Sequence, residues 1–589
     1  MNNEPITFKS IFKLILDNKK ALLYGQVFTF IAILISIPIP LMLPVLVDEV
    51  LLHKPSYIVN SINYFFGNTT AFNYIAIVTF AVIFLRFLYF VVSIIVTKIF
   101  TKIAKYVTFM IRKRLIEHLK ISSMNEYETL GSGAIASNLV TDVNTLDSFI
   151  ISSASRFVSS VFTLLAVGVV MVMIDPVLGI LILVIQPLIM LISKKMSKKV
   201  GALKKEENIA IEEFQNSIGE TLDLYGQIKA SNKESYFFSK AVEQANIMQK
   251  TSNEYGYKSV AYERLSYTIF LAAFEILRAS GLILVAYSDL SIGMMFAMFS
   301  YIWFIMTPVQ DILSMQYSYA SAKAAIERIN RILLLKTESS KEKKIDSSNV
   351  DIFINNLDFS YIKNKKVLSG ISLDIKHGSK IALIGASGSG KTTLAQVISG
   401  FYEKQSGELK YNGIDIEDLD KSSLRERVFL VLQMPILFNS TLRFNITMGN
   451  ESITDEEIYK ALEMAQLLFA VNDMKDGLDT IVGKHGIRLS GGQRQRLSVA
   501  RMIIANPSIV IFDESTSALD VQTEAKLQTS INSFLTNKTV ITIAHRLSTV
   551  KHVDMIYVLD DGKIVQRGSH KELEYEEGHY MEFIKNQLI

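Results

Sequence analysis

The segment that decides the fold of the carboxyl-terminal half is Gly385-Ala386-Ser387-Gly388-Ser389-Gly390-Lys391-Thr392. It fits the pattern G-x-x-x-x-G-K-[ST] and follows an apolar run at 381–384 that predicts a strand. The glycines let backbone N–H groups turn inward around phosphates, Lys391 supplies a positive charge, and the Thr392 hydroxyl can bind Mg²⁺. Residues 393–398 predict a helix whose positive N-terminus faces the anion. The segment therefore predicts a nucleoside triphosphate site.

A second apolar run, Ile509-Val510-Ile511-Phe512, is typical of a buried parallel strand and ends in Asp513-Glu514. At the end of such a strand we expect Asp513 to hold Mg²⁺ and Glu514 to polarise an attacking water. Between the two runs, Leu489-Ser490-Gly491-Gly492-Gln493 opens a helical pattern at 494–504, which predicts a second anion site.

Residues 489–493 resemble the signature sequence of ATP-binding cassette (ABC) proteins, and the other motifs of that family follow in family order. Tyr361 resembles the aromatic residue that stacks on adenine. Gln433 stands where the family's Q-loop glutamine senses Mg²⁺ and the membrane domain. Residues 517–520 match the D-loop, and His545 matches the switch histidine that contacts the γ-phosphate. Because these motifs occur together and in order, chance agreement is negligible.

The resemblance implies that ATP and Mg²⁺ are the cofactors, and it assigns a role to each matching residue. The expected catalytic residues are Glu514, His545 and Gln433, and the expected Mg²⁺ contacts are Thr392, Gln433 and Asp513. The residues expected to bind ATP are Tyr361, Gly385, Ser387, Gly388, Ser389, Gly390, Lys391, Thr392, Thr393, Ser490, Gly491, Gly492, Gln493, Asp513 and Asp520.

The amino-terminal half predicts a membrane domain. Hydrophobic residues make up 49% of the 589, and the mean hydropathy of +0.29 is too high for a wholly soluble chain. About 20 apolar residues span a bilayer, and six stretches before residue 340 qualify: 22–47, 74–97, 157–174, 177–192, 265–287 and 294–312. We expect a tight turn at Asp175-Pro176; one long buried segment is the alternative, which Pro176 opposes.

The lysines orient these segments. Lysines cluster before the first segment and after the fourth, whereas the loops at 48–70 and 288–293 carry almost none, so the lysine-rich ends face the cytoplasm. The first segment is too long to be a typical signal peptide, and we expect it to be retained. The sequence thus predicts a multi-pass protein of the cell membrane with a cytoplasmic ATPase domain.

Charge and cysteine content exclude other classes of protein. The net charge is only +4 and is spread along the chain, which argues against nucleic acid as a partner. There is no cysteine, so disulfides and thiolate metal sites are excluded. The lysines after the fourth segment can attract lipid head groups, although positive-inside topology together with a solvated helix face is the favoured explanation.

The expected fold class is a membrane α-helical domain of six transmembrane helices with long cytoplasmic extensions, followed by an α/β P-loop ATPase domain with a helical subdomain. The expected boundaries are a membrane domain at 1–335, a linker at 336–349 and an ATPase domain at 350–589. The polar stretches 98–156 and 193–264 predict helical hairpins. Residues 131–142 and 220–227 resemble the coupling helices of ABC exporters.

Three charged residues, Arg86, Glu275 and Arg278, fall inside predicted membrane helices. Charge in a membrane is costly unless it is paired or faces water. Glu275 and Arg278 are spaced i, i+3, so a structural pair and a polar patch that faces the substrate are equally favoured.

The resemblance implies a half-transporter whose ATP sites form between two copies, because the loop encloses the phosphates from one side only. We expect a homodimer, with a heterodimer as the alternative. The expected function is ATP-driven export or flipping of an amphipathic lipid, drug or peptide by alternating access. The alternatives are an importer of the same architecture, for example for iron chelates, and a nucleotide-regulated channel or regulatory subunit.

Overall fold

The computed structural model describes residues 4–588 except 55–56, 68–69, 339–340, 363–364, 434, 484–488, 515–518 and 545. The chain forms two compact units. The first unit comprises Met1–Ile116 and Ile135–Leu334, and the second comprises Glu117–Ala134 and Leu335–Ile589.

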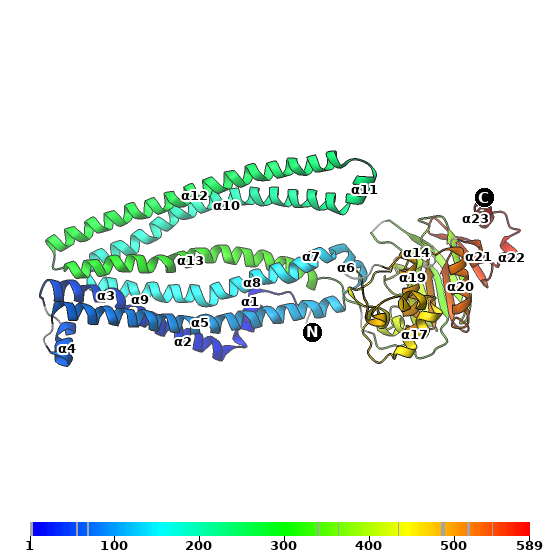
Figure 1. Ribbon diagram of the computed structural model, residues 1–589, viewed down its shortest axis with the longest axis horizontal. Coiled ribbons are helices and arrows are strands. Elements are labelled where there is room, and N and C mark those ends of the chain that lie inside the picture. The colour runs from blue at the N-terminus through cyan, green and yellow to red at the C-terminus, as the bar shows by residue number, and fades with distance from the viewer. Residues whose placement is uncertain are drawn as a thin grey trace. The chain divides into compact units, whose positions relative to one another are not determined.

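The first unit is helical throughout its described residues (Figure 1). Its elements are α1 (Phe8–Leu16), α2 (Lys19–Ser36), α3 (Pro38–Pro44), η1 (Val45–Leu51), α4 (Tyr57–Phe66), α5 (Ala71–Lys120), α7 (Ser132–Ser137), η2 (Asn138–Asp142), α8 (Val143–Ile151), η3 (Ser152–Phe157), α9 (Val158–Ile174), α10 (Pro176–Asp223), α11 (Tyr225–Ala230), α12 (Glu234–Tyr287) and α13 (Ile292–Leu333). The last residues of α5 and the first of α7 belong to the second unit.

Within the described residues, five helical stretches are long and apolar enough to cross a bilayer. They are Lys19–Leu51, Ala71–Lys120, Ser132–Ile174, Glu234–Tyr287 and Ile292–Ile312. The fourth predicted segment forms the start of α10, where the apolar stretch Pro176–Ile185 is shorter than a full span. The turn predicted before α10 is confirmed. Asp175 is extended, its carboxylate accepts a hydrogen bond from the Leu178 N–H (2.8 Å), and Pro176 occupies the first helical position.

Helices α10 and α12 lie side by side and form the long second hairpin, with α11 at its tip (Figure 1). The second predicted coupling region, 220–227, overlaps this tip, which extends to Ala230. Side-chain contacts between α10 and α12 hold this hairpin together. Ser266 donates to the Met196 sulfur (3.1 Å), and the Lys204 ammonium lies 4.7 Å from the centre of the Tyr255 ring.

The first hairpin turns earlier than predicted. Helix α5 ends at Lys120 and α6 spans Met124–Leu130, whereas the prediction placed the turn at 131–142. The reason is packing within the second unit, where Ser123 N–H donates to the Lys336 carbonyl (2.9 Å) and Glu338 N–H to the Ile121 carbonyl (2.8 Å). Residues 138–142 instead belong to the returning part of the hairpin, where they form the π-helical stretch η2.

The predicted linker, 336–349, is held along the second unit over its described residues. The Asp420 N–H donates to the Lys343 carbonyl (2.9 Å), and the Arg425 guanidinium donates to the Glu338 carboxylate (2.9 Å for one of two bonds). The Lys- and Glu-rich composition of the predicted linker therefore supplies partners for a charged surface.

The second unit contains two larger sheets. A four-stranded antiparallel sheet has the order β2-β1-β4-β5, and a six-stranded sheet has the order β12-β11-β3-β10-β9-β6, in which β12 is antiparallel to its neighbour and the other pairs are parallel. The strands are β1 (Ile352–Phe359), β2 (Leu368–Ile375), β3 (Lys380–Gly385), β4 (Ser406–Tyr411), β5 (Ile414–Asp415), β6 (Val428–Val431), β7 (Ser440–Thr441), β8 (Ile481–Val482), β9 (Ile509–Asp513), β10 (Thr539–Ile543), β11 (Met555–Asp560) and β12 (Lys563–Gly568).

Helices cover the mostly parallel sheet, so its central strands are buried on both faces and consist of unbroken apolar runs. In β9, for example, every residue is buried. The helices are α6 (Met124–Leu130), α14 (Lys391–Ile398), α15 (Lys421–Arg427), α16 (Leu442–Thr447), α17 (Asp455–Met464), α18 (Leu468–Asn472), η4 (Gly477–Asp479), α19 (Gly491–Ala505), α20 (Val521–Asn532), α21 (Leu547–Val550), α22 (His570–Leu573) and α23 (His579–Leu588). The helical insert predicted between 433 and 489 corresponds to α16–α18 and η4.

An ion pair between the partly exposed Arg328 and the buried Asp142 joins α13 to η2 within the first unit. The Arg328 guanidinium donates to both oxygens of Asp142 at 2.6–3.1 Å, and the Asp142 side chain is only 5% exposed. Hydrogen bonding to that carboxylate raises the pKa of Arg328. Such a two-bond contact holds the two segments in one register.

We expect Arg328→Gln to loosen this junction by about 2 kcal/mol, since it removes charge-assisted bonds from a buried carboxylate. That loss corresponds to roughly 30-fold faster amide hydrogen exchange through local opening, measured across Asn138–Ile151. Arg331→Gln is the matched control, because Arg331 is exposed on the same helix. Equal exchange in both variants would contradict the assignment.

Candidate ATP-binding and hydrolysis site

The phosphate loop follows the central strand β3, and its backbone requires glycine. Gly385 has φ +147°, and a Cβ there would lie 2.0 Å from the Leu559 carbonyl oxygen. Gly390 has φ +100°, and a Cβ there would lie 2.8 Å from Leu368. Helix α14 begins at the next residue, Lys391. The chain thus turns tightly and presents backbone N–H groups at a helix N-terminus, which fits a bound polyphosphate.

Lys391 already lies within this loop. Its Nζ donates to the carbonyls of Gly385 (2.9 Å) and Ala386 (2.8 Å), and the residue is 5% exposed. Burial lowers the pKa of Lys391, while the charges of Glu514 and Asp513 act in the opposite direction. The ammonium is therefore positioned among the loop carbonyls by the fold itself.

Two oxygen ligands suited to Mg²⁺ meet at the edge of the sheet. The Thr392 hydroxyl donates to the Asp513 carboxylate (3.1 Å), and Asp513 ends β9 with 4% exposure. Across the residues that the structure describes, no group of three or more His, Cys, Asp or Glu side chains could hold a metal by itself. This fits Mg²⁺, which takes one or two protein oxygens and completes its shell with phosphates and water.

The expected water-polarising residue, Glu514, lies just past β9 in a left-handed backbone conformation (φ +46°). Non-glycine residues adopt this conformation at a cost, and it is concentrated at functional sites. The Gln433 amide donates to the Glu514 carboxylate (2.6 Å), and Gln495 donates to the Gln433 carbonyl (3.2 Å). The structure therefore brings Gln433 and Glu514 together, and it adds Gln495, which sequence reasoning missed.

The signature segment forms the capped start of α19. Ser490 Oγ accepts from the Gln493 N–H (3.2 Å), and Gln493 Oε1 accepts from the Ser490 N–H (2.8 Å). This capping box fixes the helix start while the first amides, including those of Gly491 and Gly492, have no carbonyl partner within the helix. The predicted anion site is thus a well-formed helix N-terminus.

Tyr361 lies beside the helix that follows the phosphate loop. Its hydroxyl lies 3.1 Å from Thr393 Oγ1 and donates to Gln396 Oε1 (3.1 Å), and its ring packs edge-on against Tyr402 with ring centres 5.2 Å apart. Burial raises the pKa of Tyr361. The ring remains 39% exposed, so one side is available to a base. Stacking on adenine remains a prediction.

Some predicted residues cannot be placed in this way. His545 and the first half of the D-loop, 517–518, lie outside the described residues. Asp520 caps α20, accepting from the Gln522 (3.1 Å) and Thr523 (2.9 Å) N–H groups, and hydrogen bonding to Thr523 lowers its pKa.

An ion pair between Arg546 and Glu524 was missed by sequence reasoning. Glu524 is 5% exposed, so the pair ties α20 to the segment after β10. Glu524 and Arg546 are 22 residues apart in the sequence, and no helix or strand periodicity relates positions at that separation. Only the position of Arg546 next to His545 pointed to this segment.

The charged residues of the membrane helices are also placed. Glu275 and Arg278 form an ion pair, which was one of the two possibilities left open by their spacing, and each side chain is 55% exposed. Arg86 is exposed. On α13, Met295 and Phe299 are buried, and Trp303 packs edge-on against Phe270.

Comparison with known proteins agrees with this geometry. The family model for the ABC transporter transmembrane region matches residues 22–309, and the ABC transporter model matches 368–517. A putative multidrug export ATP-binding/permease protein of Bacillus subtilis is 30% identical, with 81% of this chain and 83% of the relative covered. The ATP-dependent lipid A-core flippase of Photorhabdus laumondii is 31% identical, with 82% of this chain and 84% of the relative covered.

A solved structure of a bacterial Atm1-family ABC exporter with ATP bound has a TM-score of 0.79 to this chain at 22% identity. The match covers 97% of this chain and 99% of that chain, which establishes that the two share a fold.

We expect Glu514→Gln to retain ATP binding but to lower turnover at least 100-fold, because the amide cannot polarise the attacking water. Phosphate release measures turnover, and calorimetric titration measures binding. Glu456→Gln, on the exposed surface of α17, is the control and should hydrolyse ATP at the parent rate. Unchanged hydrolysis in Glu514→Gln would remove that residue from its role.

The adenine prediction has its own test. Loss of one stacking ring costs about 1 kcal/mol or more, so Tyr361→Leu should raise the Kd for ATP roughly fivefold or more. Tyr361→Phe, which keeps the ring and loses only the bonds to Thr393 and Gln396, should stay within about twofold. Titration in the Glu514→Gln background avoids hydrolysis. Equal weakening in both variants would assign the role to the hydroxyl.

Proposed function

Because the chain belongs to the ABC transporter family and couples ATP hydrolysis to export across a membrane, we propose that its cargo is an amphipathic molecule and that it works as a homodimer. The protein is a multi-pass membrane protein with its ATPase domain on the cytoplasmic side. The proposal has three parts, which are the chemistry of the ATP site, the need for a second copy, and the nature of the cargo.

In the proposed ATP site, the loop from Gly385 to Gly390 surrounds the phosphates, and Lys391 neutralises their charge. Thr392 and Asp513, 3.1 Å apart, would hold Mg²⁺, which supplies charge stabilisation to the phosphoryl group. Glu514 orients and deprotonates the attacking water, and Gln433 holds the Glu514 carboxylate in place. Tyr361 positions the base.

The observation that carries the proposal is the 2.6 Å contact between Gln433 and Glu514. Gln433 lies on the segment that leads from β6 into the helical insert. A movement of that segment would therefore be passed through Gln433 to the Glu514 carboxylate. A purely regulatory nucleotide site would not require a polarising carboxylate held beside the Mg²⁺ ligands. The presence of Glu514 and Gln433 together with the Mg²⁺ ligands favours a pump over a nucleotide-regulated channel.

A second copy is proposed because each loop leaves the γ-phosphate open on one side. Ser490, Gly491 and Gly492 form an uncovered helix N-terminus that can close that side in another copy. Two copies of this chain would form two such sites, each with every predicted residue. Binding of ATP then closes the two ATPase domains, and hydrolysis releases them, which alternates the access of the membrane helices.

Support for an amphipathic cargo comes from two sources. The named relatives are a multidrug export protein and a lipid A-core flippase. In the membrane unit, the half-exposed pair of Glu275 and Arg278 lies in the otherwise apolar stretch 265–287 of α12, and Trp303 is 47% exposed on α13. A membrane unit that presents both charge and aromatic surface suits a molecule with both polar and apolar parts.

The test is ATPase activity of the purified protein in lipid nanodiscs, with panels of lipids, amphipathic drugs and peptides. One class should raise turnover at least twofold in the parent and not in Glu514→Gln. Stimulation only by soluble polar compounds would contradict the amphipathic cargo. No activity from a single chain, restored by a second protein, would contradict the homodimer.

Direction is checked with inside-out vesicles and ATP outside. Export predicts that the stimulating compound accumulates in the lumen, away from the ATP. Accumulation on the ATP side would instead support an importer of the same architecture.

A further inference from the structure

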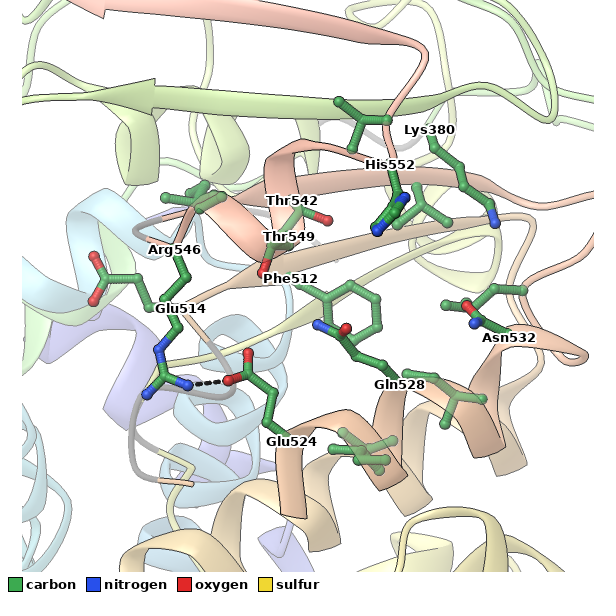
Figure 2. Close-up of a pocket in the computed structure, with 18 of the residues that line it drawn as sticks. Lys380, Phe512, Glu514, Glu524, Gln528, Asn532, Thr542, Arg546, Thr549 and His552 are labelled. Atoms are coloured by element: carbon green, nitrogen blue, oxygen red, sulfur yellow. Dashed lines mark hydrogen bonds and ion pairs between the residues drawn. The ribbon is translucent and has the colours of Figure 1, made fainter. Parts of the chain in front are cut away.

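A cavity of about 590 Å³ lies within the ATPase unit between helix α20 and the face of the parallel sheet (Figure 2). Among the described residues that line it, none belongs to the phosphate loop at 385–392. The cavity is partly open to solvent, and pockets of this size can hold small molecules. It leaves out the phosphate loop and reaches the ATP site only at Glu514, so a ligand could occupy most of it without displacing the phosphates.

The body of the cavity is apolar. Strand β10 contributes one face, on which Val540 and Thr542 alternate inward, and β9 contributes Phe512. Helix α20 and the turn after it supply Leu527, Ile531 and Leu535, each no more than 6% exposed. A strand rises about 3.3 Å per residue, so the slot from Val540 to Ala544 is about 13 Å long. It accommodates an extended chain rather than a compact sphere.

One end of the slot is polar and positive. Lys380 begins β3, beside Val540 in the sheet register, and Asn532 ends α20. Figure 2 shows Lys380, His552 and Asn532 gathered at this end. The Lys380 backbone N–H donates to Asp554 (2.7 Å), but within the described part of the chain no carboxylate forms an ion pair with its ammonium group.

The other end of the slot meets the hydrolytic edge of the sheet. It is lined by Glu514 and by the Arg546–Glu524 ion pair, marked by the dashed line in Figure 2. Glu524 stands on α20, whose cap Asp520 belongs to the D-loop, and Arg546 follows the predicted switch histidine. The cavity thus separates α20 from the two strands whose ends carry Asp513 and the switch segment.

We propose that this cavity is a regulatory binding site for a single-chain amphipathic carboxylate, such as a medium-chain fatty acid. The carboxylate lies at the positive end, where it receives hydrogen bonds from the Lys380 ammonium, the Asn532 amide and the His552 ring. The alkyl chain lies in the apolar slot between β10 and α20. Both the length of the slot and its charge at one end favour this class over a neutral or compact ligand.

Binding there slows ATP hydrolysis. An alkyl chain beneath α20 holds the Arg546–Glu524 pair and the Asp520 cap in the spacing seen here, and it thereby restrains the two segments that flank the hydrolytic edge. ATP binding at the phosphate loop is unaffected, because that loop does not line the cavity. The result is inhibition that added ATP does not relieve.

The experiment uses octanoate on the full-length protein in nanodiscs, with each variant's hydrolysis rate divided by its own rate without octanoate. Octanoate should inhibit the parent. Lys380→Gln, which removes the charge-assisted contact, should raise the half-inhibitory concentration about fivefold or more. Gln528→Trp, which fills the slot from a partly exposed position on α20, should abolish inhibition.

Two controls keep the proposal testable. Lys526→Gln removes an exposed lysine from the same helix outside the cavity and should respond as the parent does. Octanol, with the same chain and no charge, should inhibit at least fivefold more weakly than octanoate. Equal shifts in Lys380→Gln and Lys526→Gln, parent-like inhibition of Gln528→Trp, or equal potency of octanol would each overturn the proposal.

A second measurement is independent of ATPase activity. Photolabelling with an octanoate analogue that carries a diazirine on its chain should modify peptides that contain α20 or β10, and excess octanoate should protect them. Labelling of the membrane helices alone, with none on these peptides, would overturn the site even if octanoate slows hydrolysis through the bilayer.

Discussion

The structure depends on one constraint, which is that a polyphosphate must be met by backbone N–H groups and hard oxygen ligands at the same edge of a sheet. Parallel strands β3, β9 and β10 provide this edge because their carboxyl ends align in register. The Thr392–Asp513 hydrogen bond meets this requirement directly, since it joins the last residue of the phosphate loop to the end of β9 across 121 positions of sequence. The remaining parts of the ATPase unit take their places around that contact.

The sequence predicted this edge well because its constraints are local. A glycine loop that tolerates no Cβ, a fully apolar strand and a capped helix start each leave a pattern within about ten residues, and each was found where predicted. Membrane segments are likewise local, since length and hydropathy define them. The turn at Asp175-Pro176 could be favoured over one long segment because proline disrupts a helix interior but is tolerated at the first helical position.

Features that depend on long-range packing were not predictable in this way. The first hairpin turns about ten residues early because Ser123 and Glu338 find partners 213 and 217 residues away along the chain. The composition of the linker at 336–349 likewise does not reveal that Glu338 pairs with Arg425. The Arg546–Glu524 pair and the cavity beside it arise only when α20 packs against the sheet. No periodicity of hydrophobic residues or spacing of charged ones records such contacts.

The membership of Glu117–Ala134 in the ATPase unit has a mechanical consequence. Helix α5 continues without a break from its apolar span into that segment, and a continuous helix transmits displacement because its backbone hydrogen bonds resist bending. Tyr402, which packs against Tyr361, also donates to Glu128 in α6 (2.8 Å). A ring that moves when a base stacks on Tyr361 would therefore act on the same segment that α5 enters. Within this unit, two side-chain contacts, Tyr361 to Tyr402 and Tyr402 to Glu128, connect the residue predicted to bind the base with the segment that contains the carboxyl-terminal end of α5.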